Sequence, residues 1–167
     1  VPAIVRPREE GGYEIVAGHR RHFASQIAGL DTMPAIVRDL DDDAATIIMV
    51  DSNLQRETLL PSERAWAYKM KLDAMKRQAG CSQVGNNFSG QRSSELMAQQ
   101  IGESKNQIFR FIRLTELIPP LLDMVDERKI AFNPAVELST SSRKNRLSYW
   151  TPWKASRPLL HSHKHSD

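Results

Sequence analysis

The stretch from residue 80 to residue 91 most constrains how this chain of 167 residues can fold. It contains three glycines, two asparagines and two serines, which favour turns and flexible backbone over helix or strand. We therefore predict a flexible linker over residues 80–92. The predicted fold class is α+β, with a small mixed domain over residues 1–79 and an all-helical domain over residues 93–138.

Before the linker, the pattern predicts short strands interleaved with helices. Three runs have strand composition, over residues 1–6, 13–16 and 34–38. Gly18 opens a predicted helix to about residue 28, and Phe23 and Ile27 define its buried side because they lie four residues apart. Three aspartates at residues 41–43 precede a second predicted helix, where their charge suits the positive helix end.

A longer helix is predicted from Pro61 up to the linker, with Ser62 as its N-cap. Apolar residues recur along it at alternating spacings of three and four, namely at Ala65, Tyr68, Leu72, Met75 and Ala79. Beyond the linker the pattern predicts helices only. They are interrupted at Gly102, at Pro119-Pro120 and before Asn133-Pro134.

The first two helices after the linker have the spacing of a helix-turn-helix motif. Ala98 is small where the helices cross, Gly102 permits the positive φ of the turn, and Ile108 packs between them. Ser104 is the predicted cap of the second helix. The residues predicted to contact DNA are Ser104, Lys105, Asn106, Gln107, Arg110 and Arg113. The alternative is an ordinary helical hairpin with a solvated face.

A second set of candidate residues lies at the strand-to-helix junction of residues 18–21. Glycine permits close approach of a ligand, N–H groups at a helix start point outward, and the two arginines Arg20 and Arg21 can bind phosphate oxygens. This pattern indicates an anion such as a nucleoside triphosphate, and two surface arginines on a helix are the alternative. The polar segment 51–57 is its candidate partner, in which Asn53 either binds Mg²⁺ or caps a helix.

The basic character of the chain comes from its last 28 residues. The net charge is +3, but residues 140–167 hold six of the 23 basic residues and one of the 20 acids. Residues 1–139 therefore carry a net charge of −2, and the overall charge is no evidence for a nucleic-acid partner.

Residues 139–167 show neither helical nor strand periodicity, and we expect a non-native or disordered tail. The bases that encode residues 144–167, begun one base earlier, are compatible with EKQAVLLDAMESEQATPSLSQAQR, an acidic amphipathic helix, a loop and the start of another helix. We hypothesise a frameshift near Ser139 or Thr140, which the coding DNA tests. The alternative is a metal-binding tract at His161, His163 and His165.

Several protein classes are excluded by simple features. No apolar run reaches the roughly 18 residues of a membrane span, and no signal peptide is visible. Cys81 is the single cysteine, which excludes a disulfide framework. We expect a cytoplasmic protein with no membrane partner. Because the chain begins at Val1 rather than Met, we expect an upstream piece to be missing.

Two sequence boxes and the helix-turn-helix motif together resemble the ParB partition-protein family. Residues 13–21, YEIVAGHRR, resemble its arginine-rich box, which usually reads Gly-Glu-Arg-Arg. Residues 52–57, SNLQRE, resemble its Glu-Asn-(Leu/Ile)-Gln-Arg box. The resemblance covers about residues 1–138. It implies a ParB/sulfiredoxin-like N-terminal domain followed by a helix-turn-helix domain.

The resemblance implies a site-specific DNA-binding protein of chromosome or plasmid partition. Such proteins read a centromere-like palindrome, bind CTP with Mg²⁺, close as homodimers and act on the nucleoid with a ParA-type ATPase. A weak CTPase activity is implied as well. The implied nucleotide-binding residues are Gly18, His19, Arg20, Arg21, Asn53, Gln55, Arg56 and Glu57, with Asn53 next to the metal.

The sequence departs from the family pattern at three positions and at both ends. His19 replaces the usual Glu, Phe23 stands where a further Arg is common, and Ser52 replaces an acid. The last change argues against hydrolysis more than against binding. The family's upstream box precedes Val1, and a frameshift would remove the dimerisation segment. We therefore expect a truncated copy, as from a plasmid or mobile element.

Three alternative functions stay open at this point. One is a helix-turn-helix transcriptional regulator without a partition role. Another is a ParB-like nuclease, although the consecutive aspartates 41–43 cannot all face one metal ion. The third is a sulfiredoxin-like reductase, which needs a cysteine where this sequence has His19.

Overall fold

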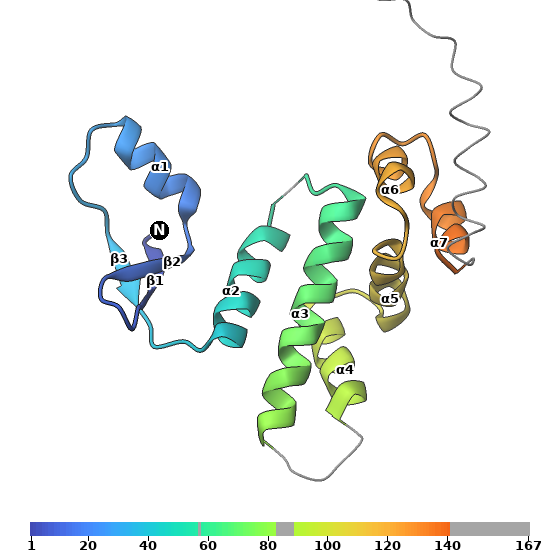
Figure 1. Cartoon of the computed structure of the whole chain (residues 1–167), viewed down its shortest axis with the longest axis horizontal. Coiled ribbons are helices and arrows are strands. Elements are labelled where there is room, and N and C mark those ends of the chain that lie inside the picture. The colour runs from blue at the N-terminus through green and yellow to red at the C-terminus, as the bar shows by residue number, and fades with distance from the viewer. Residues whose placement is uncertain (57, 83–88, 141–167) are drawn as a thin grey trace, which may run out of the picture.

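The computed structural model describes residues 1–56, 58–82 and 89–140, and its elements agree with the predicted α+β class. A small sheet and α1 lie at one end of the molecule, α2 and the long α3 lie in the middle, and α4–α7 pack on the other side of α3 (Figure 1). The elements in chain order are β1 (Ala3–Pro7), β2 (Tyr13–Ala17), α1 (His19–Ile27), β3 (Ala35–Val37), α2 (Asp42–Leu54), α3 (Pro61–Ser82), α4 (Ser89–Ile101), α5 (Lys105–Leu114), α6 (Pro119–Asp126) and α7 (Phe132–Thr140).

The sheet has the strand order β2-β1-β3. The central strand β1 pairs antiparallel with β2, with Val5 opposite Ile15, and parallel with β3, with Ala3 opposite Ala35. Ala3, Val5, Val16 and Ala17 of the sheet are buried, and so are Ala45 and Val50 of α2, a helix that contacts both β2 and α3. The three predicted strands are therefore confirmed, and the sheet supplies the edge from which α1 starts.

The predicted buried side of α1 is wrong. Phe23 is 64% exposed and Ile27 is 74% exposed, and no residue of α1 is buried. Residues spaced by four share one helix face, but burial also requires a surface opposite that face. The helix projects from the sheet in Figure 1, so this face has no partner in the described part of the chain.

Two helix starts show different kinds of cap. Asp41 is the N-cap of α2, where its side chain accepts a hydrogen bond from the N–H of Ala44 at 2.7 Å. The predicted cap of α3 is wrong, because Ser62 lies inside that helix. Its N–H and hydroxyl donate to the carboxylate of Asp126 in α6, at 3.0 and 2.5 Å. A carboxylate from a distant helix thus replaces the local cap.

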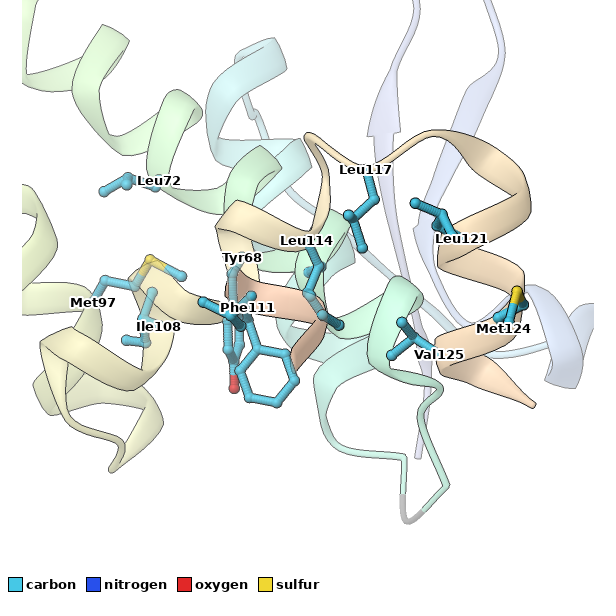
Figure 2. Close-up of a cluster of buried hydrophobic side chains, with 13 residues drawn as sticks. Tyr68, Leu72, Met97, Ile108, Phe111, Leu114, Leu117, Leu121, Met124 and Val125 are labelled. Carbon is cyan, nitrogen blue, oxygen red and sulfur yellow. The ribbon is translucent and has the colours of Figure 1, made fainter. Parts of the chain in front are cut away.

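The main core joins α3 to the helices that follow it. Figure 2 shows Tyr68 and Leu72 of α3 packed together with side chains from α4, α5 and α6. The Tyr68 and Phe111 rings meet edge to face, with centroids 5.6 Å apart. The buried members of this core are Ala65, Tyr68, Leu72, Met97, Ile108, Phe111, Leu114, Leu117, Leu121, Met124, Val125, Ala135 and Val136.

The predicted linker is wrong at both of its ends. Residues 80–82 belong to α3 and residues 89–92 belong to α4, while residues 83–88 lie outside the described residues. Glycine and serine lower helix propensity by less than about 1 kcal/mol each, and packing of a neighbouring helix easily exceeds this cost. Because α3 shares its core with α4–α7, packing does not divide the chain at residues 80–92.

The predicted tail also starts too early. Ser139 is buried and Thr140 ends α7, so both belong to the helical part. Residues 141–167, including the three tail histidines, lie outside the described residues. Among the described helices, none combines the length and hydropathy needed to cross a membrane.

Candidate nucleotide site and DNA interface

A cavity of about 240 Å³ lies between the β2–α1 junction and the carboxyl end of α2. Its lining residues are Val16, Ala17, Gly18, His19, Arg20, Arg21, Met49, Ser52, Asn53 and Arg56. The two predicted boxes, more than 30 residues apart in the sequence, therefore meet at one site. Of the predicted nucleotide-binding residues, Gln55 is exposed outside the lining, and Glu57 lies outside the described residues.

Gly18 is required here by the backbone itself. Its φ is +112°, a region that favours glycine, and an added Cβ would lie 3.0 Å from Cβ and 3.1 Å from Cα of Ala3. The residue thus lets β1 pass directly beneath the start of α1. That start has no side-chain cap, so the first N–H groups of α1 are available to an anion at the cavity.

The three arginines of the cavity differ in their contacts. Arg21 donates to the backbone carbonyls of Val1 and Pro2, the latter at 2.7 Å, and so ties α1 to the start of the chain. Arg20 and Arg56 are exposed and form no ion pair with any described residue. Two unpaired guanidinium groups beside an uncapped helix start make the cavity attractive to a phosphate chain.

The wall formed by α2 is fixed to α3 from behind. Nζ of Lys71 donates to Oδ1 of Asp51 at 2.6 Å, and the Lys71 side chain is only 1% exposed. One turn further along α2, Leu54 packs against the main core. Asn53 and Ser52, which line the cavity, thus lie between two anchors that connect this wall to the helical part of the protein.

The residues of the cavity allow Mg²⁺ but give it few ligands. No carboxylate of a described residue lines the cavity, whereas Mg²⁺ is usually held by one or two carboxylates together with substrate phosphates. The amide oxygen of Asn53 and the hydroxyl of Ser52 are the neutral oxygens available. Any ion at this site would therefore be bound mainly by the phosphates of the nucleotide, with Asn53 nearby.

A second, larger groove of about 900 Å³ lies at the other end of the sheet. Its lining includes two arginines and six acids, and Arg6 already pairs with Glu14 and Asp42 at 2.7 Å each. This acidic surplus repels phosphate, so the smaller cavity is the better anion site.

The helix-turn-helix prediction agrees with the local geometry. The side chain of Ser104 caps α5 by accepting a hydrogen bond from the N–H of Gln107 at 3.2 Å. Gly102 has a φ of +76° at the turn, and Ile108 is 2% exposed between the helices. Arg64 of α3 reaches Glu103 in this turn at 3.5 Å, which ties the motif to α3.

The predicted DNA-contacting residues differ in their exposure and in their contacts. Ser104, Asn106 and Arg113 are exposed, whereas Lys105, Gln107 and Arg110 are half-buried. Lys105 pairs with Glu95 at 3.6 Å. Arg110 donates to Oδ1 of Asn133 at 2.5 Å and lies 5.2 Å from the ring centroid of Phe132, so it braces α5 against α7.

Two site residues were missed from the sequence. Met49 lines the cavity one helical turn before Asn53, and the spacing of four on one helix was the available signal. Phe109 is 38% exposed on α5 and follows Asn106 by three residues, which places both on the same face.

Comparison with known proteins identifies the family. Residues 1–54 match the ParB N-terminal domain family. The probable chromosome 1-partitioning protein ParB of Deinococcus radiodurans is 38% identical over 146 residues, which are 87% of this chain and 45% of that protein. The chain belongs to the ParB family. This confirms the resemblance drawn from the two boxes.

A ParB structure also supports the fold. The C-terminally truncated chromosome-partitioning protein ParB from Caulobacter crescentus, complexed to the centromeric parS site, is similar with a TM-score of 0.59 and 28% identity, covering 94% of this chain and 77% of that one. The same Caulobacter protein complexed with CTP-gamma-S is 30% identical, with a TM-score of 0.36, covering 90% of this chain and 76% of that one. The chain spans about half the length of the curated ParB relatives it matches, 45% of the Deinococcus protein and 48% of the Spo0J protein of Thermus thermophilus.

Proposed function

We propose that this chain holds the nucleotide-binding and DNA-reading parts of a partition protein, with CTP and Mg²⁺ binding at the cavity and a centromere-like palindrome recognised by α5. The observation that carries the proposal is the meeting of Gly18–Arg21 with Ser52, Asn53 and Arg56 around one cavity. A structural role alone needs neither the unpaired Arg20 nor the unpaired Arg56 at this place.

The size of the cavity fits the phosphate part of a nucleotide better than a whole nucleotide. Its 240 Å³ is below the roughly 300–1,000 Å³ of sites that enclose a whole small molecule. The base and sugar would lie at the open side of the cavity. CTP is proposed as the nucleotide because the Caulobacter relative has been solved with CTP-gamma-S.

The DNA part of the proposal rests on α5. Its exposed face carries Asn106 and Arg113, which suit base edges and phosphates, and its start is capped and open to solvent. The Caulobacter relative, similar in fold, was solved with the centromeric parS site. A palindromic site, a homodimer and a ParA-type ATPase partner on the nucleoid complete the proposal by family membership.

We propose nucleotide binding as the activity of the cavity. No carboxylate of the described residues lines it to activate water, and Ser52 stands where the family has an acid. Weak CTP hydrolysis thus stays a prediction from the family, as do the alternative roles of transcriptional regulator and nuclease.

Isothermal titration calorimetry on the full chain tests the proposal, with CTP and ATP each in the presence of Mg²⁺. We expect CTP-selective binding that Arg20→Ala weakens at least ten-fold, because it removes an unpaired guanidinium from the cavity. Arg38→Ala is the matched control, since Arg38 is an exposed arginine outside the cavity lining, and it should leave the affinity unchanged. Equal weakening by both variants, or no nucleotide binding, would contradict the proposal. A repeat of the titration with EDTA in place of Mg²⁺ shows whether nucleotide binding requires the ion.

A further inference from the structure

The recognition helix α5 has one buried face and one open face. Ile108, Phe111 and Leu114 are buried in the main core. At 100° per residue, the direction opposite these three residues runs midway between positions 109 and 113, about 20° from each. Phe109 and Arg113 therefore lie near the centre of the open face of α5, and the exposed fraction of Phe109 is 38%.

Phe109 is more exposed than Phe111, the other aromatic residue of α5, which is 9% exposed in the main core. The Phe109 ring takes part in none of the aromatic contacts between described residues, which join Phe111 to Tyr68 and to Phe132 instead. A single exposed apolar side chain is common on protein surfaces, so what Phe109 can contact has to be judged from its neighbours on this helix face.

The neighbours of Phe109 on this face show which kind of contact fits. Asn106 lies one turn before it and Arg113 one turn after it, and both are exposed. Asparagine suits the paired donor and acceptor of adenine, and arginine suits guanine or a phosphate. The one apolar group that B-DNA presents at the major-groove floor is the 5-methyl group of thymine.

We propose that Phe109 reads the 5-methyl group of a thymine in the major groove of the DNA site, next to a base contacted by Asn106. This inference rests on the proposed DNA-binding function and specifies one position of the site. Side chains three residues apart on a helix are separated by about 5–6 Å, which is between one and two steps of 3.4 Å along a DNA strand. The thymine therefore lies one or two base pairs from the base that Asn106 contacts.

The test begins with selection of a DNA site. The full chain is incubated with a random-sequence duplex library, bound duplexes are sequenced, and each enriched thymine is replaced singly by uracil, which lacks only the 5-methyl group. For the wild type we expect about a four-fold loss of affinity at one thymine per half-site, the value for withdrawing one buried methyl group. The other thymines should tolerate uracil.

Two variants assign the methyl contact to its residue. F109A should bind the thymine and uracil duplexes with equal affinity, while F109L should keep part of the difference. L96A is the matched control, because Leu96 is an exposed apolar residue of α4, 46% exposed, and this variant should keep the full difference. Circular dichroism should show unchanged helix content in all three variants.

The outcomes separate the two proposals. If selection enriches no sequence, site-specific DNA binding fails and this inference fails with it. If a sequence is enriched but no thymine is sensitive to uracil, or if F109A keeps the sensitivity, DNA binding stands and the role of Phe109 is overturned.

Discussion

Removing Asp51 and removing Lys71 from their ion pair should lower the free energy of unfolding by different amounts. Lys71 is 1% exposed at its side chain and Asp51 is 42% exposed, with Nζ and Oδ1 separated by 2.6 Å. Asp51→Ala leaves a buried ammonium group without its carboxylate, a change that costs about 3–5 kcal/mol when both partners are buried. Because the carboxylate side is open to water, we expect a smaller loss of about 2–3 kcal/mol.

Removal of the other partner should cost less. Lys71→Met replaces a buried charge by an apolar side chain of similar length, and the remaining carboxylate of Asp51 is still partly in water. Because the charge left behind is hydrated rather than buried, we expect this substitution to cost less than about 1.5 kcal/mol. The expected order is therefore that Asp51→Ala destabilises the protein more than Lys71→Met.

Urea unfolding followed by circular dichroism measures both free energies of unfolding. In thermal unfolding, the Asp51→Ala loss corresponds to a midpoint lower by about 4–12 °C, at about 2–4 °C per kcal/mol for a chain of this size. Lys76→Met is the control, because Lys76 pairs with Asp73 at 4.0 Å and both side chains are about half exposed, so its loss should stay below about 0.5 kcal/mol. If Lys71→Met costs as much as Asp51→Ala, the reasoning about the buried charge is refuted.

Three shorter predictions follow from other contacts. Gly18→Ala should lower the free energy of unfolding by about 1–3 kcal/mol, measured in urea, because the φ of +112° is strained for alanine and its Cβ would meet Ala3 at 3.0 Å. Burial, with the nearby charge of Glu103 as a smaller cause, raises the pKa of Tyr68 in the folded protein. Above about pH 10 the tyrosine therefore loses its proton in the unfolded state before it does so in the folded state, and the free energy of unfolding should fall as the pH rises. Tyr68→Phe should reduce that fall by up to about 1.4 kcal/mol per pH unit, and an unchanged alkaline slope would contradict the assignment. Arg113→Ala should reduce the slope of log affinity against log salt by about 0.9 in DNA titrations, and an unchanged slope would mean that Arg113 contacts no phosphate.

The predictions that succeeded from sequence depend on local geometry. A strand followed by Gly18 and a helix, and a helix ending near Asn53, each place polar groups at an element end, and the structure brings these two ends to one cavity. Ser104 and Gly102 likewise act through backbone groups within four residues of themselves. Such features follow from the chain around them and need no knowledge of the remaining fold.

The predictions that failed depend on distant partners. The spacing of Phe23 and Ile27 does not show whether a surface covers them, and none does among the described residues. Ser62 has the composition of a cap, but Asp126, 64 residues away, decides its role. Pairwise contacts of this range leave no mark in a single sequence.

The placement of α3 leads to a prediction about how the protein unfolds. A boundary at residues 80–92 would let α3 remain folded when the helices after it are destabilised. The shared core implies the opposite, because Tyr68 and Leu72 of α3 are buried in the same cluster as Leu114 of α5. Leu114 is fully buried, so Leu114→Ala should cost about 2–5 kcal/mol.

Trp66 reports on α3 in this experiment. In a background with W150F and W153F it is the one tryptophan, and it lies on α3 with Nζ of Lys69 5.2 Å from its ring centroid. If the core is shared, Leu114→Ala should shift the Trp66 fluorescence transition and the circular dichroism transition to lower urea by the same amount. A Trp66 transition that stays in place while part of the helix signal is lost would show that α3 folds independently of α5. The chain would then divide where its glycines and serines predict, and the common core would contribute little to cooperativity.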